Sequence, residues 1–410
     1  MIGAHESGPD GAGVRVRSAE QQMTGTPERI GRYTVAKELG SGGMGEVYLA
    51  YTPGGQPVAV KLIRSDKLDP VTRARFEKEA LIARTVIGTN RVARFLEADP
   101  FADRPWLAME YVAGRTLLAC VDQDGVLPLP LVASLGALLA EGLSAVHAAE
   151  LLHRDLKPQN VIMGTEGPII IDFGLGAFMD AAKESLSHSG MIIGTVRCMP
   201  PEQASGHPKV TPAADVYALG TVLLYAAARH YPYDGAVWEA VAVQVANPDI
   251  GPDLSGVPEG LKPLIASMLA HVPEDRPTLD DVSKACSKLL KAAGKAPADA
   301  RLALIAHTTA GGTPDAAKEP LSPSFEKLLE DQAKITDDAG LDLPLDSPRG
   351  TAEAEEPEPE EAEQDEPHPD SAEAVKPKAE PKARPTAVKP PASKRVADEL
   401  RAEYAADTAL

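Results

Sequence analysis

The sequence predicts an α+β fold of two lobes, in which an antiparallel β-sheet lobe with one main helix precedes a mainly helical lobe, followed by a disordered tail. Strand-like runs separated by turn residues fill residues 33–60, and long apolar-periodic segments begin at residue 131. After about residue 290, Pro, Glu, Lys and Ala dominate, and such a composition cannot bury enough apolar surface to offset chain entropy. We expect a disordered segment at 1–31, one folded domain at 32–290 and a disordered tail at 291–410.

The sheet lobe is predicted from short runs with the composition of strands. These runs are residues 33–36, 46–50, 57–60, 92–96 and 106–111. A glycine cluster and a Pro-Gly-Gly turn connect the first three into an antiparallel meander. The main helix is expected from residue 70 to about 87, because Phe76, Ala80 and Ala83 recur at helical spacing.

The second lobe is predicted from apolar segments with helical periodicity. These segments are residues 131–149, 214–228, 237–246 and 261–270. The first two are apolar enough to raise the question of a membrane. Glu141 and His147 interrupt the first, and the second is shorter than the roughly 20 residues that a helix needs to cross a bilayer. We therefore expect buried helices and no membrane span.

Charge and cysteine content limit the classes of partner. A formal net charge of -19 opposes a general affinity for nucleic acid or anionic lipid, so proteins and small molecules are the expected partners. The three cysteines are odd in number and in no metal-type spacing, which indicates neither a disulfide framework nor a zinc site. Residues 1–30 contain no apolar stretch of the signal-peptide type. We expect a cytoplasmic protein.

The tail changes the sign of its charge along its length. An acidic run over 353–370 gives way to a Lys/Pro run over 376–395, and a solvated, extended linker is favoured over a docking element. Two amphipathic stretches, 324–335 and 397–406, could each fold as a short helix on a partner, although isolated helices of this length are marginal in water.

A glycine cluster between the first two predicted strands suits phosphate binding. Residues 40–47 read GSGGMGEV, a G-x-G-x-x-G-x-V pattern. Glycine lets the backbone approach a ligand closely and adopt positive φ, so the tip of a hairpin can donate N–H groups to phosphates. The pattern alone is weak, because a glycine-rich hairpin is often only a turn and the same letters before a helix would indicate a dinucleotide fold.

Lys61 ends a strand-like Val-Ala-Val-Lys run, and the alternation points it away from its apolar neighbours. A lysine there can hold phosphate oxygens, and it needs an opposite charge to fix its side chain. Glu77 and Glu79 on the following helix are the candidates. Glu79 is preferred because it lies beside the apolar face that Phe76 and Ala80 mark. Taken singly, each of these charges could simply be solvated.

Residues 153–160 read HRDLKPQN and form the most specific motif of the chain. Asp155 can accept the proton of an attacking hydroxyl, Lys157 can neutralise a transferring phosphoryl group, and Asn160 can hold a metal ion through its amide oxygen. The alternative without a catalytic role is a polar loop that ends at Pro158, and the residues that follow disfavour it.

Residues 169–174 read IIIDFG, a β-branched run that ends in an acid, an aromatic residue and a glycine. The carboxylate of Asp172 at a strand end suits Mg²⁺, which takes a few carboxylate oxygens and fills its shell with phosphates and water. A D-F-G triplet alone would be a common loop, but the preceding strand and the distance from Asn160 disfavour that interpretation.

These motifs, in this order over residues 32–290, resemble the protein kinase superfamily, and specifically the eukaryotic-like (Hanks-type) serine/threonine kinases of actinobacterial type. The resemblance implies a two-lobed protein kinase fold, ATP with Mg²⁺ or Mn²⁺ as cofactors, and transfer of phosphate to Ser or Thr of protein substrates in signal transduction. Lys157, two residues after Asp155, resembles the serine/threonine rather than the tyrosine subgroup.

Two rival functions remain beside a kinase. A catalytically inactive kinase-fold scaffold usually lacks one of the lysine, base or metal positions, and none is lacking here. A small-molecule phosphotransferase is disfavoured by residues 195–204, which in this family shape a peptide groove.

The resemblance also assigns roles residue by residue. Lys61 would contact the α/β-phosphates and pair with Glu79, Asp155 would be the catalytic base, and Asn160 and Asp172 would be the metal ligands. The nucleotide would be enclosed by Leu39, Gly40, Ser41, Gly42, Gly43, Met44, Gly45, Val47, Ala59, Met109, Glu110, Val112 and Met163. Among these, Met109 matches the gatekeeper, and residues 110–112 match the hinge that holds adenine.

The resemblance extends to the activation segment. Thr195 would meet Asp155 and Lys157, while Ser187 and Ser189 resemble the paired phosphosites of bacterial kinases. We expect autophosphorylation in trans, which implies a transient homodimer, with the phosphate pairing to Arg154. Phosphopeptide-binding forkhead-associated proteins are then candidate partners. The alternative is a solvated serine-rich loop.

Further along the chain, residues 215–220 resemble the buried helix that anchors the catalytic loop, and Arg276 matches the arginine that pairs with Glu202. Two departures from the family pattern stand out. Residues 197–200 lack the aromatic residue usual there, which leaves the shape of the substrate groove open. Residues 89–92 replace the usual His-Pro connection, with an expected effect on local packing only.

Overall fold

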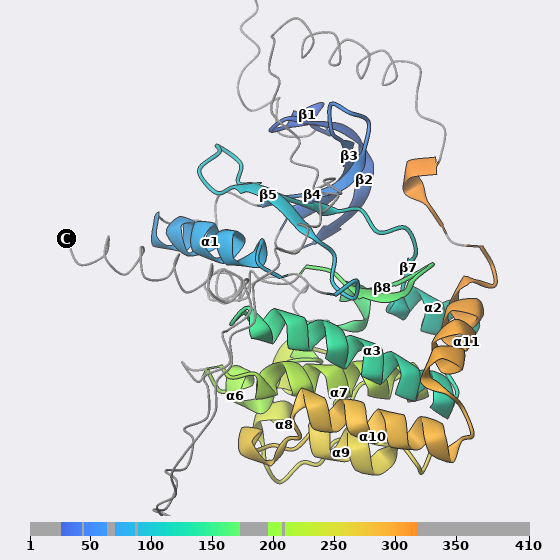
Figure 1. The fold of residues 1–410 in the computed structure, drawn as a ribbon. Helices are drawn as coiled ribbons and strands as arrows, with labels where there is room; N and C mark the ends of the chain where they lie inside the picture. Colours follow the sequence, from blue (N-terminus) through green and yellow to red (C-terminus); the bar gives the residue numbers. More distant parts are fainter. Residues whose placement is uncertain are drawn as a thin grey trace, which may run out of the picture.

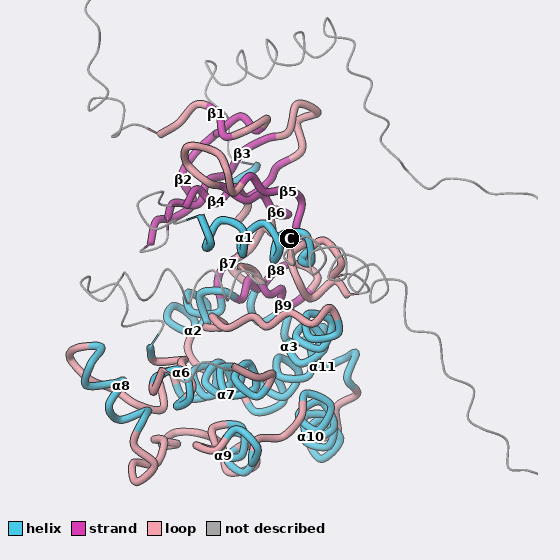
Figure 2. The backbone as a smooth tube through the Cα atoms, turned by 90° about the vertical axis from the view of Figure 1, so that its left-hand side faces the viewer, coloured by secondary structure: helices cyan, strands magenta, loops and turns pink. Residues whose placement is uncertain are grey.

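The computed structural model describes residues 26–42, 45–63, 70–86, 89–172, 196–206, 210–312 and 314–318. Within these residues, a sheet lobe lies above a helical lobe (Figure 1). Figure 2 shows a second, smaller sheet at the level where the two lobes meet. The predicted two-lobed α+β class is confirmed.

The N-terminal lobe is a six-stranded antiparallel sheet in the order β1-β2-β3-β4-β6-β5. Its strands are β1 (Arg29–Ile30), β2 (Tyr33–Gly42), β3 (Gly45–Tyr51), β4 (Pro57–Ile63), β5 (Phe95–Asp99) and β6 (Trp106–Glu110). Helix α1 (Pro70–Ala83) packs against β5 and buries Phe76, Ala80 and Ala83, as their spacing predicts. Strand β1 lies inside the segment that we expected to be disordered. The sequence did not predict it, because two residues are too few to show the alternation of apolar and polar side chains that indicates a strand.

The C-terminal lobe is built around helix α3 (Leu129–Ala148), which contacts the helices on its sides. The others are α2 (Leu117–Asp124), α6 (Pro201–Ala204), α7 (Ala213–Ala228), α8 (Trp238–Ala246), α9 (Lys262–Met268), α10 (Leu279–Ala292) and α11 (Pro297–Thr309). The smaller sheet has the order β7 (Arg115–Thr116), β8 (Val161–Gly164) and β9 (Gly167–Ile170). Single helical turns are η3 (Pro158–Asn160), η5 (Pro273–Asp275) and η6 (Ala316–Lys318).

Helices α3, α7, α8 and α9 match the predicted apolar segments to within two residues at either end, whereas α2 and α10 are not among the predictions. Helix α10 buries Leu279, Val282, Cys286 and Leu290 along one stripe. Its N-terminus is closed by a capping box between Thr278 and Asp281. Both the apolar stripe and the capping box are present in the sequence, but the polar residues between the apolar ones make the helix hard to recognise.

The folded region extends past residue 290, where we expected the disordered tail to begin. Helix α10 ends at Ala292, and α11 follows with Ala300 and Leu304 buried in the main core. An Ala-rich segment with few large apolar residues becomes helical here because it packs on an existing core, which offsets the weak stability of an isolated helix. The predicted helical stretches 324–335 and 397–406 lie outside the described residues.

Within the described part of the chain, α3 is the one helix whose length and apolar composition would suffice to cross a membrane. Most of its apolar window, 61%, is buried inside the protein. Helices α7, α10 and α11 provide this cover, which is how a core helix is packed.

Leu139 tests the packing of α3, because its side chain is fully buried in the main core. Replacing it with alanine leaves a cavity, and we expect Leu139→Ala to lower the free energy of unfolding by about 2 to 5 kcal/mol. Urea titration followed by circular dichroism measures this change. The matched control is Leu302→Ala on α11, where the leucine is 60% exposed and the change should stay within about 0.5 kcal/mol. Equal losses in both variants would contradict the assigned core.

Candidate active site

One face of the N-terminal sheet carries the residues expected around the nucleotide. The register pairs Val47 with Lys61 and Ala59 with Met109, and directly paired residues project to the same face. The opposite face of the sheet holds a separate apolar cluster that includes Val60. The sheet therefore separates a face that forms the lobe's own core from a face that looks toward the helical lobe.

The glycine-rich connection is a tight hairpin between β2 and β3. Pairing continues to Gly42 and Gly45, and Gly43 and Met44 lie outside the described residues. Gly45 has a φ of 151°, and a Cβ atom there would overlap the carbonyl oxygen of Leu62. Gly40 has open space around it, and Leu39 beside it is exposed. Gly40 and Gly45 thus leave backbone without side chains on both strands of the hairpin, which allows a ligand to approach closely.

Lys61 on β4 reaches across to Asp172. Its Nζ lies 2.8 Å from Asp172 Oδ2, and both side chains are mostly covered. Asp172 has a φ of 59°, in the left-handed region that aspartate tolerates better than most residues. The side chain of Glu79 lies outside what the structure describes, so its pairing with Lys61 stays a prediction.

The predicted base, lysine and amide of the catalytic loop lie together. Lys157 Nζ is 2.7 Å from Asp155 Oδ2. The Asn160 amide nitrogen donates to the Asp155 carbonyl at 2.8 Å and to Asp155 Oδ2 at 3.3 Å. Burial opposes the charge of Lys157, but the attraction of Asp155 outweighs it and raises the pKa of the lysine. The loop thus holds one carboxylate between two donors.

The buried carboxylate of Asp215 at the start of α7 fixes this loop from below. It accepts the backbone N–H groups of His153 and Arg154, each at 2.9 Å, and lies 2.7 Å from His147 Nε2. Burial raises the pKa of Asp215, but the hydrogen bonds and the neighbouring histidines outweigh it and hold the pKa below its usual range. Arg154 has a φ of 59°, and its bond to Asp215 stabilises this uncommon backbone conformation.

The strand before Asp172 is tied to the same loop. The Ile171 amide donates to the Asn160 carbonyl at 2.9 Å, and the Ile171 carbonyl lies 3.1 Å from His153 Nε2. A carbonyl can only accept, so His153 Nε2 carries a proton. The backbone bond between Asn160 and Ile171 therefore ties the first metal-ligand candidate, Asn160, to the residue that precedes the second, Asp172.

The hinge candidates connect β6 to β7. Met109 on β6 is buried, Glu110 is exposed, and the Val112 side chain lies over Gly164 of β8. At the end of the hinge, Gly114 has a φ of 153°, and a Cβ atom there would overlap the Met163 carbonyl oxygen. This glycine allows the chain to pass close to the floor of the expected adenine pocket.

The metal-ligand candidates are few, but their oxygen donors are of the kind that Mg²⁺ prefers. No group of three or more His, Cys, Asp or Glu side chains that could hold a metal lies within the described ranges. Mg²⁺ commonly takes only one or two protein carboxylates and completes its shell with phosphate and water. The Asn160 amide nitrogen donates a hydrogen bond to Asp155, so the amide oxygen is directed away from that residue. An amide oxygen and the Asp172 carboxylate therefore fit such an ion.

The predicted pair of Arg276 and Glu202 is confirmed. Two parallel bonds of 2.7 and 2.8 Å join them, and the guanidinium stacks 5.0 Å from the Tyr217 ring centroid. The neighbouring segment, which lacks the usual aromatic residue, places Cys198 in the interior beside a cavity that Asp155 also lines. Thr195, Ser187 and Ser189 lie outside the described residues.

Residues 89–92, the second departure, form part of the junction between the lobes. The buried Arg91 guanidinium donates to the Glu166 carbonyl at 2.7 Å, and Val92 forms an isolated bridge with Ile170. The expected effect on local packing therefore includes a contact to β9.

Two site residues were not predicted. His147, seen in the sequence only as an interruption of an apolar run, lies against Asp215. A polar residue on the buried face of an apolar helix was the available signal, since buried polar groups need partners. The contact of Tyr217 with Arg276 could not be predicted, because an aromatic residue in an apolar helix is expected simply to be part of the core.

Comparison with known proteins was consistent across sequence and structure. A family model described as the protein kinase domain matches residues 33–287. The chain is 40% identical over 260 residues to the probable serine/threonine-protein kinase PkwA of Thermomonospora curvata. The aligned region covers 63% of this chain and 34% of that protein. It is 41% identical over 258 residues to the serine/threonine-protein kinase AfsK of Streptomyces coelicolor, with 62% and 32% covered. The match thus spans about a third of the length of these curated relatives.

A solved structure is similar over the same region. It is the crystal structure of a mutant of the PknI kinase domain of Mycobacterium tuberculosis, with a TM-score of 0.51 and 26% sequence identity. The likeness covers 64% of this chain and 96% of that one.

Asp215 should be essential for the stability of the catalytic loop. Because its pKa is depressed in the folded protein, its contribution is complete above its unfolded pKa of about 3.9 and is lost as the pH falls through the folded value. We expect Asp215→Asn to lower the free energy of unfolding by about 2 to 4 kcal/mol at pH 7. The difference from wild type should shrink below about pH 4. Urea titration at both pH values measures it.

The control for this experiment is Asp234→Asn, because the Asp234 side chain is 82% exposed and its ion pair with Arg197 lies at the surface. This variant should stay within about 0.5 kcal/mol of wild type. A loss in Asp215→Asn no larger than that of the control would show that the buried carboxylate does not hold the loop.

Proposed function

Because this chain belongs to the protein kinase family, we propose that it transfers the γ-phosphoryl group of ATP to serine and threonine side chains of proteins. The single observation that supports this most strongly is the hydrogen-bonded group of Asp155, Lys157 and Asn160, joined through Ile171 to the segment that carries Asp172. Lys61 bonds Asp172 from the other lobe. These are the charge types that phosphoryl transfer uses for positioning and electrostatic stabilisation. The similarity to proteins named serine/threonine kinases supports the substrate class.

In the proposed mechanism, Asp155 orients the substrate hydroxyl and accepts its proton. Lys157, bonded to the same carboxylate, is near enough to stabilise negative charge on the transferring group. Lys61 would release Asp172 and hold phosphate oxygens, while Asp172 and Asn160 hold the cation. Bound Mg²⁺ or Mn²⁺ would supply charge neutralisation at the β- and γ-phosphates. The nucleobase would lie between β4 and β8, on the face where Ala59 and Met109 pair.

The wider biological setting is part of the same proposal. We infer a cytoplasmic enzyme, because three buried free thiols suit a reducing compartment. Autophosphorylation in trans would require a transient homodimer. A phosphorylated loop would then offer a ligand to phosphopeptide-binding forkhead-associated proteins.

Asp155 and Lys61 provide the direct test of the proposed activity. We expect Asp155→Asn to reduce phosphate incorporation from labelled ATP into a generic basic protein by at least about 100-fold, because the base is lost while its hydrogen-bonding shape remains. Lys61→Ala should cause a loss of similar size, since it removes a phosphate contact. Circular dichroism should show that both variants remain folded.

Matched controls come from an exposed ion pair on α10. The side chains of Asp280 and Lys284 are 73% and 70% exposed, so Asp280→Asn and Lys284→Ala should retain activity within about twofold. An Asp155→Asn variant as active as Asp280→Asn would refute the kinase assignment. No incorporation by the wild type under any divalent cation would favour the inactive-scaffold alternative.

Ser187 and Ser189 test the proposed autophosphorylation. We expect mass spectrometry of wild-type protein incubated with ATP to find phosphate at one or both, and none in Asp155→Asn. Mixing Lys61→Ala protein with active wild type should place phosphate on the inactive chain, because the reaction occurs in trans. Ser185→Ala is the neighbouring control and should leave the modification intact. Phosphate in Asp155→Asn protein incubated alone would contradict autocatalysis.

A further inference from the structure

Residues 297–318 lie beyond Ser287, the last residue that the family model matches. They run along one side of the molecule from the helical lobe to the sheet lobe. In Figure 1 they rise in orange from α10, through α11, to the short turn η6 beside the sheet. Residue 313 within them lies outside the described residues. We call this segment the strap.

The first half of the strap is fixed to the helical lobe. Along α11, Ala300, Leu304 and Thr308 recur every four residues, and all three are buried. This stripe faces α3, β8 and β9. Arg301 adds bonds to the carbonyl and the carboxylate of Glu166, at 2.9 and 3.0 Å. The helix is therefore a built part of the lobe.

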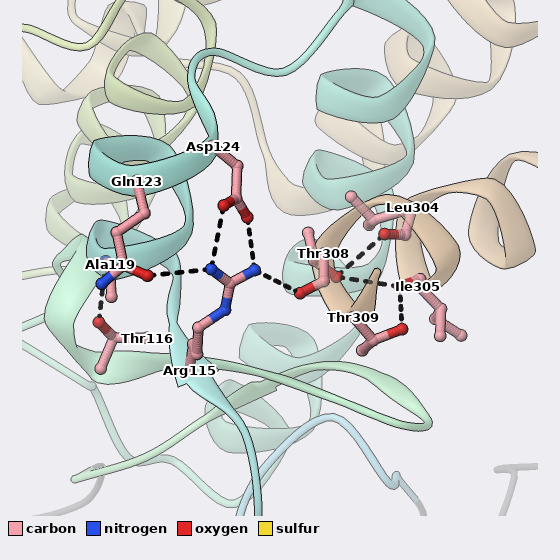
Figure 3. Close-up of polar contacts among 9 residues, drawn as sticks. All are labelled: Arg115, Thr116, Ala119, Gln123, Asp124, Leu304, Ile305, Thr308 and Thr309. Carbon is pink, nitrogen blue, oxygen red and sulfur yellow. Dashed lines mark hydrogen bonds and ion pairs between the residues drawn. The ribbon is translucent and has the colours of Figure 1, made fainter. Parts of the chain in front are cut away.

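The end of α11 is joined to the first residues after the hinge. Arg115 on β7 donates to the Thr308 carbonyl at 2.8 Å, and the same guanidinium bonds Asp124 and Gln123 of α2 (Figure 3). The Thr308 carbonyl is one of the last four of the helix, which have no partner within it. A cation there also complements the negative end of the helix dipole. Arg115 thus clamps the strap at the exit of the hinge.

The second half of the strap contacts the sheet lobe and the hinge itself. The Ala316 amide donates to the Tyr111 hydroxyl at 2.7 Å, and the Tyr51 hydroxyl donates to the Ala317 carbonyl at 3.3 Å. Asp315 shapes the turn by accepting the Ala317 amide at 3.0 Å. Burial raises the pKa of both tyrosines, and the charge of Asp315 raises each further. Tyr111 lies in the hinge, and Tyr51 ends the strand that begins at the glycine-rich hairpin.

We propose that the strap positions the hinge and β3 for nucleotide binding by holding the sheet lobe at a fixed separation from the helical lobe. The proposal rests on the proposed function, because the hinge and the hairpin are the expected nucleotide contacts. Tyr51, Tyr111, Ala316 and Ala317 are the positioning groups, and none of them needs to touch the nucleotide with its side chain.

The strap contacts would act on the fraction of molecules that can bind the nucleotide. Two lobes joined by a short connection move relative to each other unless their interface is large. When only a fraction of molecules has the binding-competent separation, the apparent dissociation constant for the nucleotide rises by the inverse of that fraction. One hydrogen bond contributes about 1 kcal/mol, so loss of a strap bond should weaken nucleotide binding several-fold and leave the chemical step unchanged.

Ala316→Pro in the full-length chain is the sharpest test. Proline removes the Ala316 N–H that donates to the Tyr111 hydroxyl, and the first position of a helical turn tolerates it. We expect the KM for ATP to rise roughly 3- to 10-fold with kcat within about twofold. Amide hydrogen exchange at residues 111–114 should become faster. Tyr51→Phe, which loses only a hydroxyl, should likewise raise the KM for ATP and speed amide exchange in the hinge.

The matched control is Tyr225→Phe, because the Tyr225 hydroxyl donates to Asp122 at 2.7 Å within the helical lobe. It should leave the KM for ATP and the exchange of the hinge unchanged. Unchanged hinge exchange in Ala316→Pro and Tyr51→Phe would overturn the strap contact. Faster exchange with an unchanged KM would overturn its role in nucleotide binding. Exchange can also be measured in Asp155→Asn protein, so failure of the kinase assignment remains distinguishable from failure of the strap.

Discussion

The buried carboxylate of Asp215 is the constraint on which the active-site arrangement depends. It takes two backbone N–H groups from the catalytic loop and lies against a histidine of α3. A charge without access to water is tolerated only when it is paired and hydrogen-bonded. The loop is therefore held in the one conformation that satisfies this carboxylate, including the left-handed backbone of Arg154. Helix α7 acts as the rigid support, because every residue from Ala214 to Ala227 is buried.

The same constraint reaches the candidate cation ligand Asp172 and the sheet lobe through a chain of hydrogen bonds and one peptide link. His153, whose amide Asp215 fixes, contacts the Ile171 carbonyl, and the next residue, Asp172, contacts Lys61 of β4. The two neighbouring motifs of residues 153–174 thus share one network with Lys61, which lies more than 90 positions earlier in the sequence. The opposite charges of Lys61 and Asp172 also compensate each other. A triphosphate with its cation could take over both partners without leaving a buried charge uncompensated.

Local patterns predicted most of this arrangement, because the chemistry depends on short runs of residues. The HRDLKPQN and IIIDFG motifs located Asp155, Lys157, Asn160 and Asp172, and the structure brings these four together. Long-range partners were harder to predict. The contact of His147 with Asp215 spans 68 residues, and that of Tyr111 with Ala316 spans 205. Helix α11 was missed because its sequence is marginal alone and gains stability from a core that composition cannot reveal.

The contacts that hold the helical lobe together and those that join it to the sheet lobe differ in strength, and this difference determines where the molecule can adjust. Arg276 and Glu202 are buried and doubly bonded, so opening that pair would leave charges without solvent and cost several kcal/mol, about 3 to 5. The strap reaches the sheet lobe through neutral hydroxyl bonds of the buried Tyr51 and the partly buried Tyr111, each worth about 1 kcal/mol. Its anchor on the helical lobe is far firmer, because Leu304 and the Arg115 clamp hold it. The end of the strap at the hinge is therefore the part that can detach while the catalytic loop stays intact.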